Sequence, residues 1–364
     1  MTFKSFIRHT ILLPCSKLYG AVVYMRNKLF DWKILRSHSF GVPIVVVGNI
    51  AVGGTGKTPH VEFILNVMRN TNHVAYLSRG YKRRTKGFVM ATSKSTPRDI
   101  GDEAYQVYHK FGGDVVVAVC EDRVFGIREL LNIDPGINMI VLDDAFQHRY
   151  VKPTAAVVVT EYNRPVYEDK LLPYGRLRES VRALNRADLV IVSKCPARLK
   201  PMDYRIFSNN INLFPYQTLF FSRLAYKPLQ PLFPDAVARI PYLDWLGPAD
   251  TVLAVAGIGN PKPFVRFLKS FSFKVKVNVF ADHHNYSRKD MEMLRDRFEK
   301  MRGENKIIVT TEKDAVRMSC NPYFPHELKA VTFYLPIEVE FVPGAGGTDA
   351  FADTLRQVIR TNSQ

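Results

Sequence analysis

A glycine-rich loop that could cradle a polyphosphate is the strongest chemical signal in the sequence. The loop consists of Ala51, Val52, Gly53, Gly54, Thr55, Gly56, Lys57 and Thr58. It follows a β-branched run at residues 42–49 and precedes residues 60–68, whose apolar side chains recur at helical spacing. This context argues against a glycine turn with an incidental lysine, because a strand and a helix flank phosphate-binding loops. The loop predicts a nucleoside triphosphate site in which Lys57 reaches the β- and γ-phosphates and Thr58 ligates Mg²⁺.

A pair of aspartates at the end of another apolar run could hold the metal. Residues 139–142 read as a short strand, and Asp143 and Asp144 follow it. In proteins with a phosphate-binding loop, a carboxylate at this position holds Mg²⁺ directly or through water. The alternative is a pair of aspartates that cap a helix. The upstream loop favours the metal, and the sequence does not rank the two carboxylates.

Three further clusters carry charges that could contact phosphate or substrate. Arg79 follows a predicted strand and precedes a basic run that could equally be solvated loop. Asp102 and Glu103 open a helical stretch, where a carboxylate could cap its own helix or face the γ-phosphate. Arg176 and Arg178 could clamp a substrate anion or could be surface charges. Position along the chain leaves these alternatives open.

The elements that would position these side chains alternate between strand and helix. Strands are predicted at residues 44–47, 74–77, 115–119, 139–142, 156–159 and 189–192. Helical patterns separate most of them, which is typical of an α/β fold with a parallel sheet covered by helices on both faces. Ligands bind outside the carboxyl ends of such strands, so we expect the charged clusters to gather at that edge.

A second, smaller α/β unit is predicted after a proline-rich stretch. Its strands are expected at residues 252–255, 275–280, 307–310 and 331–335. Residues 219–224 are expected to pair with residues 337–342, which makes a short β-ribbon that carries a helix at residues 349–361 back to the first unit. His283 and His284 follow a strand of the second unit, where closure could bring a histidine to the nucleotide. Without closure they would be solvated loop residues.

Length and composition fit this organisation. At 364 residues the chain is large for one core, and two domains are the natural expectation. The predicted order is an N-terminal segment (1–37), a P-loop NTPase-type domain (38–215), a linker (216–248), a smaller α/β domain (249–342) and a C-terminal helix (343–364). Four cysteines lie far apart without metal-ligand spacing, so we expect free thiols and no structural zinc site.

The chain is strongly basic, with 51 Lys and Arg against 34 Asp and Glu and a formal charge of +17. Such a surplus suits nucleic acid, an anionic membrane surface or an acidic substrate. No nucleic-acid recognition module is visible, so we expect no nucleic-acid partner. A GTPase is disfavoured because Ser193-Lys194-Cys195-Pro196 lacks the aspartate of a guanine reader, and because Lys313 and Asp314 are adjacent.

The N-terminal segment, residues 1–37, combines seven Lys and Arg with a single acid. One helical face would carry Leu18, Ala21, Val22, Met25, Leu29 and Trp32, flanked by Lys17, Arg26, Lys28 and Lys33. No uncharged run reaches the roughly 18–20 residues that span a bilayer, and no cleavage site for a signal peptide follows. The pattern predicts a basic amphipathic helix lying in a membrane interface, with a helix that caps the first domain's core as the alternative.

Taken in order, the motifs resemble those of one family, the tetraacyldisaccharide 4′-kinases of lipid A biosynthesis. The resemblance runs through residues 13–20, 47–49, 53–59, 77–81, 101–103, 143–148, 172–179, 257–261, 282–284 and 311–314. Two positions depart from the family pattern. Ala145 stands where glycine is usual, which tests whether that position needs a positive φ. Tyr174 stands where a small residue is usual, and it could reshape the substrate pocket.

The resemblance implies a reaction and its site residues. The γ-phosphate of ATP, with Mg²⁺, would pass to the 4′-hydroxyl of an acylated glucosamine disaccharide 1-phosphate, forming lipid IVA at the cytoplasmic face of the inner membrane. The resemblance places the general base at Asp102, supported by His283 or His284, with charge from Lys57, Arg79 and Arg123. The substrate contacts implied are Asn49, Gln147, His148, Arg176 and Arg178.

Overall fold

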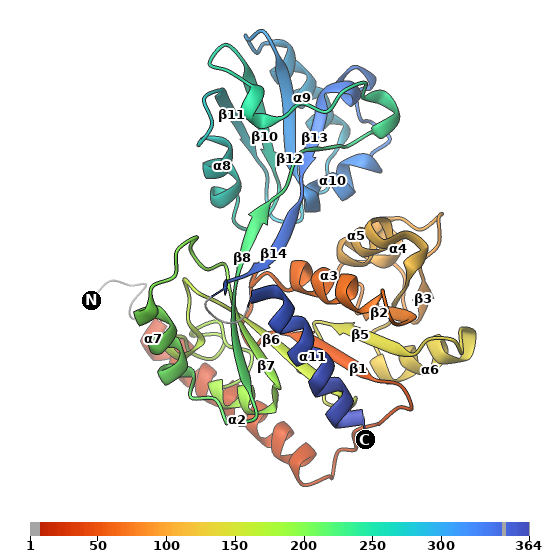
Figure 1. Cartoon of the computed structure of the whole chain (residues 1–364), viewed down its shortest axis with the longest axis vertical. Helices are drawn as coiled ribbons and strands as arrows, with labels where there is room; N and C mark the ends of the chain where they lie inside the picture. The colour runs from red at the N-terminus through yellow and green to blue at the C-terminus, as the bar shows by residue number, and fades with distance from the viewer. Residues whose placement is uncertain (1–7, 344–346, 364) are drawn as a thin grey trace.

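The computed structural model describes residues 8–343 and 347–363, and its larger sheet has nine strands. These are β1 (Ile44–Gly48), β2 (Val74–Ser78), β3 (Val89–Met90), β4 (Val115–Val119), β5 (Met139–Asp143), β6 (Ala155–Glu161), β7 (Leu189–Ser193), β8 (Thr218–Tyr226) and β14 (Ile337–Phe341). Their order is β14-β8-β7-β6-β1-β5-β2-β4-β3. All six strands predicted for the first unit are present, and the predicted α/β class is confirmed (Figure 1).

The centre of this sheet is parallel. β1 pairs in parallel with β5 and with β6, and only the edge strands β3 and β14 run antiparallel to their neighbours. Every residue of β1 is buried, as expected of a strand that is covered on both faces. Its alternate side chains enter opposite cores: Val45 and Val47 face one, whereas Ile44 and Val46 face the other.

Helices cover the two faces of the larger sheet. The core containing Val45 also includes side chains from α3 (Lys57–Met68), α5 (Asp102–Phe111) and α11 (Gly347–Ser363). The core containing Ile44 includes side chains from α6 (Arg123–Ile133) and α7 (Pro201–Ile211). A short helix, α4 (Pro97–Ile100), precedes α5. The phosphate-binding loop therefore lies between a central strand and a helix that is packed along its length.

The smaller sheet has the order β11-β10-β12-β13-β9. Its strands are β9 (Gln230–Pro231), β10 (Thr251–Ala256), β11 (Lys274–Val279), β12 (Lys306–Thr311) and β13 (Thr332–Leu335). The helices α8 (Lys262–Leu268), α9 (Arg288–Glu299) and α10 (Glu312–Ser319) accompany it, and two further apolar clusters lie within this unit. The four strands predicted for the second unit are confirmed. The domain boundaries themselves stay predictions.

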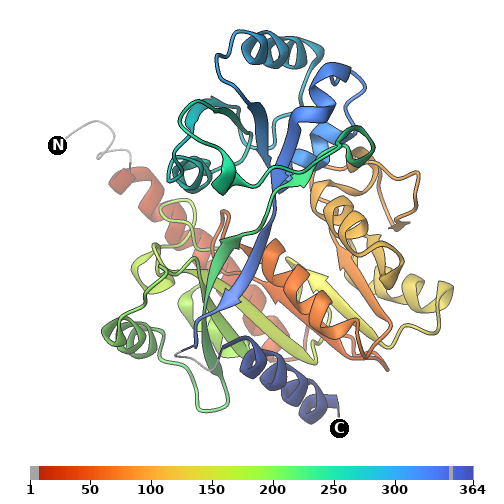
Figure 2. The same cartoon turned by 45° about the horizontal axis from the view of Figure 1, so that its top comes forward.

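A two-stranded ribbon joins the units, as predicted. The first half of β8 pairs with β7 in the larger sheet, and residues 222–226 pair antiparallel with β14. The two strands run side by side toward the smaller unit in both views (Figures 1 and 2). The segment predicted as a linker from residue 216 thus begins as a strand of the larger sheet. The C-terminal helix α11 returns to that sheet, although residues 344–346 and 364 lie outside the described residues.

The N-terminal helix α2 (Leu13–Asp31) follows a π-helical turn (Arg8–Leu12) and packs on the larger unit with the side that carries the buried Ser16 and Phe30. Ser16 donates a hydrogen bond to the carbonyl oxygen of Leu171, and Tyr19 donates one to that of Arg178. Arg26, predicted to flank the apolar stripe, is on this docked side and donates to the carbonyl oxygen of Gln147. Residues 1–7 of the predicted segment lie outside the described residues.

The predicted apolar stripe of α2 faces away from the protein. Leu18, Val22, Met25 and Trp32 are 69%, 62%, 54% and 60% exposed. The stripe therefore does not cap the core of the first unit, since the buried contacts of α2 are made by its other side. None of the helices in the described parts of the chain has the length and apolar character needed to cross a bilayer.

Candidate active site

The phosphate-binding loop joins β1 to α3 in a conformation that requires glycine. Gly53 and Gly56 have φ angles of 114° and 91°, which side-chain-bearing residues rarely adopt. Lys57 is the first residue of α3, so the loop meets the N-terminus of a helix. Asn49, fully buried at the end of β1, donates a hydrogen bond of 3.1 Å to the Thr55 hydroxyl. The loop thus has the form that its sequence predicts.

Two residues at the end of β7 hold this loop in place through hydrogen bonds to its carbonyl oxygens. Ser193 donates to the carbonyl oxygen of Thr55, and Lys194 donates to that of Gly54. Lys194 also lies 3.2 Å from the carboxylate of Glu161, at the end of the neighbouring β6. Sequence reasoning examined this strand end only as a guanine reader and missed the bracing role. The rule that carboxyl ends of parallel strands share one edge was the available signal.

Asp144 lies against the lysine of the loop. Its Oδ1 atom is 3.4 Å from the Nζ atom of Lys57 and 3.0 Å from Nη1 of Arg178. Burial raises the pKa of Asp144, but these two cations outweigh burial and hold the pKa below its ordinary value. The positive φ of this turn, 47°, falls on Asp144, and Ala145 is not among the positive-φ residues of the described chain. The departure from glycine at Ala145 is therefore tolerated without strain.

Asp143 is a different kind of carboxylate. It is 3% exposed and accepts a hydrogen bond from the Tyr76 hydroxyl at Oδ2, whereas its Oδ1 atom has no hydrogen-bond partner among the described residues. Burial, followed by the charges of Glu103 and Asp144, raises the pKa of Asp143 to about 7. An unpaired buried carboxylate oxygen is costly unless a cation compensates it. The site therefore fits Mg²⁺, which Thr58, in the first turn of α3, could also ligate.

No three His, Cys, Asp or Glu side chains group as a metal site within the described residues.

Two arginines and a histidine predicted for the site, Arg79, Arg123 and His148, interact with one another through their charges. Arg123, at the start of α6, is 4% exposed and donates to the carbonyl oxygens of Cys120 and Glu121. Burial, and then the charge of Arg123, lower the pKa of His148 to about 4, so that its imidazole is neutral at pH 7. Arg79 is exposed, and its charge contributes to the lowered pKa values of Arg123 and His148.

The remaining residues predicted for the substrate lie along one flank of the loop. The side-chain amide of Gln147 donates to the backbone carbonyl oxygen of Asn49, and its Oε1 atom lies 3.4 Å from Nη1 of Arg178. The backbone carbonyl of Arg176 accepts from the N–H of Val52, while the Arg176 side chain is exposed in a polar hollow. The hollow is lined by Asn163, Arg164, Pro165, Glu168, Asp169, Tyr174, Gly175 and Arg176.

The two units meet at Asp102, the first residue of α5. Its Oδ2 atom is 3.1 Å from Nδ1 of His283 and 2.9 Å from Nε of Arg317. Burial raises the pKa of Asp102, but His283 and Arg317 together hold it below its ordinary value. The Nε2 atom of His283 is 3.3 Å from Nζ of Lys313, which also lies 3.6 Å from Glu103. The Asp102 carboxylate and the His283 imidazole are thus in contact, and each also contacts a cationic side chain of α10.

His284 occupies a different environment from its neighbour. Its Nε2 atom is 3.0 Å from the carboxylate of Asp290, and its ring stacks on Phe280 at 4.6 Å. Both partners belong to the smaller unit. The geometry therefore joins Asp102 to His283, and the expectation that His284 could take this place does not fit the structure.

Sequence reasoning missed the part played by α10. Lys313 and Arg317 are four residues apart, so they lie on one face of this helix and reach His283 and Asp102. The motif at residues 311–314 was recognised without a role, and the i,i+4 spacing of two cations was the signal that could have supplied one.

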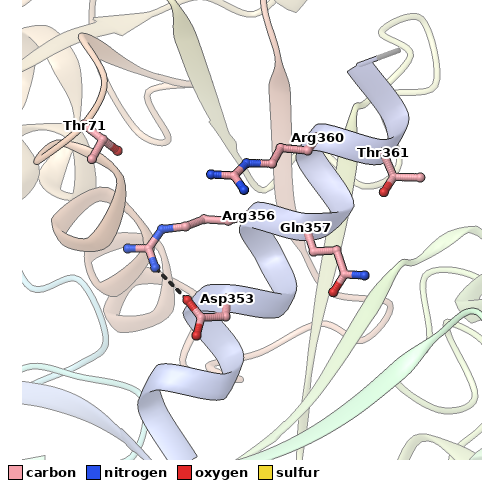
Figure 3. A pocket seen from close by; sticks show the side chains of 6 residues that line it. All are labelled: Thr71, Asp353, Arg356, Gln357, Arg360 and Thr361. Atoms are coloured by element: carbon pink, nitrogen blue, oxygen red, sulfur yellow. Dashed lines mark hydrogen bonds and ion pairs between the residues drawn. The ribbon is translucent and has the colours of Figure 1, made fainter.

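A hollow elsewhere on the larger unit contains none of these residues. It is lined by Thr71, Asp353, Arg356, Gln357, Arg360 and Thr361, mostly on one side of α11 (Figure 3). The charge of Arg356 is already paired with Asp353 at 3.0 Å. We assign no role to this hollow.

The parallel sheet with the phosphate-binding loop at its centre and the Lys57–Asp144 contact at its carboxyl edge define a P-loop kinase. The sequence profile described as Tetraacyldisaccharide-1-P 4′-kinase matches residues 8–360, and the chain belongs to this family. It is an ATP-dependent 4′-kinase of lipid A biosynthesis, as the motifs predicted.

Named relatives agree over nearly the whole chain. The tetraacyldisaccharide 4′-kinase of Bacteroides thetaiotaomicron is 48% identical over 363 residues, which are 98% of this chain and 94% of the relative. That of Bacteroides fragilis strain YCH46 is 47% identical over 358 residues, with the same shares covered. A crystal structure of LpxK from Aquifex aeolicus in complex with ATP has a TM-score of 0.72 at 26% identity, covering 97% of this chain and 99% of that one.

Proposed function

We propose that the chain transfers the γ-phosphate of Mg·ATP to the 4′-hydroxyl of an acylated glucosamine disaccharide 1-phosphate at the cytoplasmic face of the inner membrane. The observation that carries this proposal is a pair of contacts, one at the phosphate-binding loop and one where the two units meet. Lys57 lies beside Asp144 in the larger unit, and Asp102 meets His283 across the two units. A phosphate clamp and a base candidate are therefore present together.

Residues of the larger unit would hold the phosphates. Lys57 and the loop N–H groups would bind the β- and γ-phosphates, and Arg123 and Arg79 would offset the charge that develops during transfer. Mg²⁺, held by Thr58 and the strand-tip aspartates, would neutralise phosphate charge when bound. Gln147, His148, Arg176 and Arg178 would orient the acceptor; this set is proposed from the family motifs together with positions beside the loop.

The Asp102–His283 pair would accept the proton of the sugar hydroxyl. Both His283 and Arg317 contact Oδ2 of Asp102, which leaves Oδ1 as the oxygen to receive that proton. Burial raises the pKa of Asp102, but its contacts with His283 and Arg317 hold the pKa below its ordinary value and keep the carboxylate ionised at neutral pH. His283, in contact with Oδ2, could share the proton that Asp102 accepts.

The α2 helix supports attachment to a membrane surface. Its apolar stripe is exposed while its other side is hydrogen-bonded to the larger unit, an arrangement that suits insertion into the headgroup region of a bilayer. The formal charge of +17 would add attraction to anionic lipids. The substrate, being an acylated sugar phosphate, would lie in that same surface.

Two assays test the proposal. Incubation with labelled ATP, Mg²⁺ and the disaccharide 1-phosphate should yield a bisphosphorylated lipid, and no product from the wild-type protein would refute the proposed reaction. Vesicles containing anionic lipid should co-sediment with the protein, and Leu18→Asp with Val22→Asp should release it. Ile133→Asp, at a side chain that is 51% exposed on α6, is the matched control and should bind as the wild type does. Equal binding of all three proteins would refute the membrane role of α2.

A further inference from the structure

A buried histidine next to the phosphate-binding loop has no part in the mechanism above. His60, in the first turns of α3, is 1% exposed. Its Nδ1 atom is 2.7 Å from the carbonyl oxygen of Gly56, and its Nε2 atom is 2.8 Å from the hydroxyl of Ser222. Its two hydrogen-bond partners are both uncharged, and an unpaired charge would be costly at this buried place, so the ring is neutral. Both ring nitrogens are therefore engaged by partners in different elements.

The chemistry of these partners fixes the direction of the two hydrogen bonds. A carbonyl oxygen can only accept, so Nδ1 of His60 carries the proton and donates to Gly56. In a neutral imidazole the other nitrogen is then an acceptor, and the Ser222 hydroxyl must donate to Nε2. The hydrogen bonds run in one direction, from Ser222 through His60 to Gly56.

The orientation of the Gly56 carbonyl fixes that of the Lys57 N–H, a group that in such a loop faces the phosphates. The Gly56–Lys57 peptide is planar, so its C=O and the N–H of Lys57 point in opposite directions. The N–H groups at the start of α3 are free of helical partners and in such a loop bind phosphate. The helix's own bond to this carbonyl, from the N–H of His60, is long at 3.4 Å. The imidazole supplies the shorter bond and so sets the direction of the Lys57 N–H.

Ser222 stands at the root of the ribbon that carries the smaller unit. Residues 218–221 of β8 pair with β7, and Ser222 is the first residue of β8 that pairs with β14, opposite Phe341. Ser222 is fully buried, and the ring of Phe341 meets that of His60 edge to face at 6.3 Å. A shift of the ribbon at this point would directly change the contacts of His60 with Ser222 and Phe341.

We propose that His60 is a positioning residue that couples the β8–β14 ribbon to the geometry of the phosphate-binding loop. It touches neither nucleotide phosphate nor acceptor in this role. Through Ser222 and Gly56 it would make the orientation of the Lys57 N–H, and hence ATP affinity, depend on the position of the smaller unit.

Two amide isosteres separate the two bonds. The amide nitrogen of His60→Asn lies near the place of Nδ1 and can keep the bond to Gly56. The longer side chain of His60→Gln carries its amide to the place of Nε2, where the amide oxygen can accept from Ser222 while the bond to Gly56 is lost. We expect His60→Gln to weaken ATP binding by about tenfold, the size of one buried hydrogen bond, and His60→Asn, which loses only the bond to Ser222, to weaken it less, by as much as Ser222→Ala does. Binding of Mg·ATP is measured by calorimetry without lipid acceptor, so the result does not depend on the acceptor.

Ser222→Ala tests the coupling while leaving His60 in place. It should weaken ATP binding severalfold in the wild-type background and have no further effect in the His60→Gln background, since the link to the loop is already cut there. Thr332→Ala is the matched control: it also removes a buried hydroxyl that donates a hydrogen bond, but in the smaller sheet and to the carbonyl oxygen of Leu328. It should lower Tm without changing ATP affinity. If His60→Asn and His60→Gln lose the same ATP affinity and the same thermal stability, His60 has a merely structural role and the proposal is overturned. Additive effects of Ser222→Ala and His60→Gln would overturn the coupling.

Discussion

The Nδ1 atom of His283 lies 3.1 Å from Oδ2 of Asp102, although the two residues are 181 positions apart and belong to different units. The contact is held in place from both sides. Arg317 donates to the same carboxylate oxygen, and the second nitrogen of His283 is beside Lys313. A proton acceptor assembled in this way exists only while the two units are docked together.

Asp102→Asn keeps the size of the side chain and removes its basicity, so kcat should fall by about 10²–10⁴ with little change in ATP affinity. His283→Ala should also lower kcat, and the double variant should be little worse than Asp102→Asn alone because the pair acts as a unit. Steady-state kinetics with lipid acceptor would measure these changes. His284→Ala is the control and should retain most activity. Fully additive losses at Asp102 and His283 would show that they have separate roles.

The two strand-tip aspartates should respond differently to pH. The raised pKa of Asp143, about 7 against an ordinary 3.8, means that the folded protein keeps a proton that the unfolded chain has lost between these values. The contribution of Asp143 to the free energy of unfolding therefore falls as pH rises from about 4 to about 7 and is constant above. With metal removed by a chelator, the Tm of Asp143→Asn minus that of the wild type should increase as pH rises from about 5 to about 8. Mg·ATP should remove that gain. Parallel Tm curves for the two proteins would contradict the raised pKa.

Asp144→Asn should instead lower kcat strongly at every pH, since the lowered pKa of Asp144 keeps it ionised throughout the neutral range. The change leaves Lys57 and Arg178 without the carboxylate that they share. We expect a loss of about 10²–10³ in kcat, the size seen when one preorganised charge contact is removed. Titration of activity with Mg²⁺ at fixed ATP would measure it. Wild-type activity and an unchanged Mg²⁺ requirement would exclude Asp144 from the metal site.

A lysine between two glutamates joins the units at a second place. Lys110 of α5 is 2.7 Å from Glu62 of α3 and 3.2 Å from Glu312 of α10. Lys110→Met would leave Glu62 buried without its cation, which should lower the free energy of unfolding by about 3–5 kcal/mol. Glu312→Gln keeps that cation and should cost about 1 kcal/mol or less. Chemical denaturation would measure both.

The matched control for this cluster is Arg356→Met, which breaks an exposed pair with Asp353 on α11. It should change stability by about 1 kcal/mol at most. A loss in Lys110→Met no larger than that of Arg356→Met would mean that Glu62 does not depend on Lys110.

Ala145→Gly tests the departure from the family pattern. Since the positive φ belongs to Asp144, glycine is not required at residue 145. The substitution should leave kcat and KM unchanged and cost about 0.5–1 kcal/mol through added freedom of the unfolded chain. Steady-state kinetics would measure kcat and KM, and thermal unfolding would measure the change in stability. A marked rise in activity would show that the family's glycine serves catalysis.

Local patterns predicted the elements, and long-range contacts explain what they could not predict. The β-branched runs gave β1, β2, β4, β5, β6 and β7 within a residue or two, because buried parallel strands are continuously apolar. The ribbon pairing also followed from pattern. The choice between His283 and His284 did not, since the two are adjacent and only the placement of α5 against the smaller unit distinguishes them. The spacing of Lys313 and Arg317 was visible in the sequence, but the partner of Arg317, Asp102, is in the other unit and could not be predicted from it.

The topology also bears on how the protein is made. The smaller sheet is inserted between β8 and β14 of the larger one, and Phe351, Leu355 and Ile359 of α11 then join the core beneath β1. A ribosome must therefore finish the whole smaller unit before it synthesises the helix that covers one face of the larger sheet. Until then the part of that face which α11 covers is exposed to solvent and to chaperones, since α3 and α5 cover only the rest. The smaller unit, whose strands β9 to β13 are contiguous in sequence, can complete its fold first, although the phosphate-binding loop is made long before it.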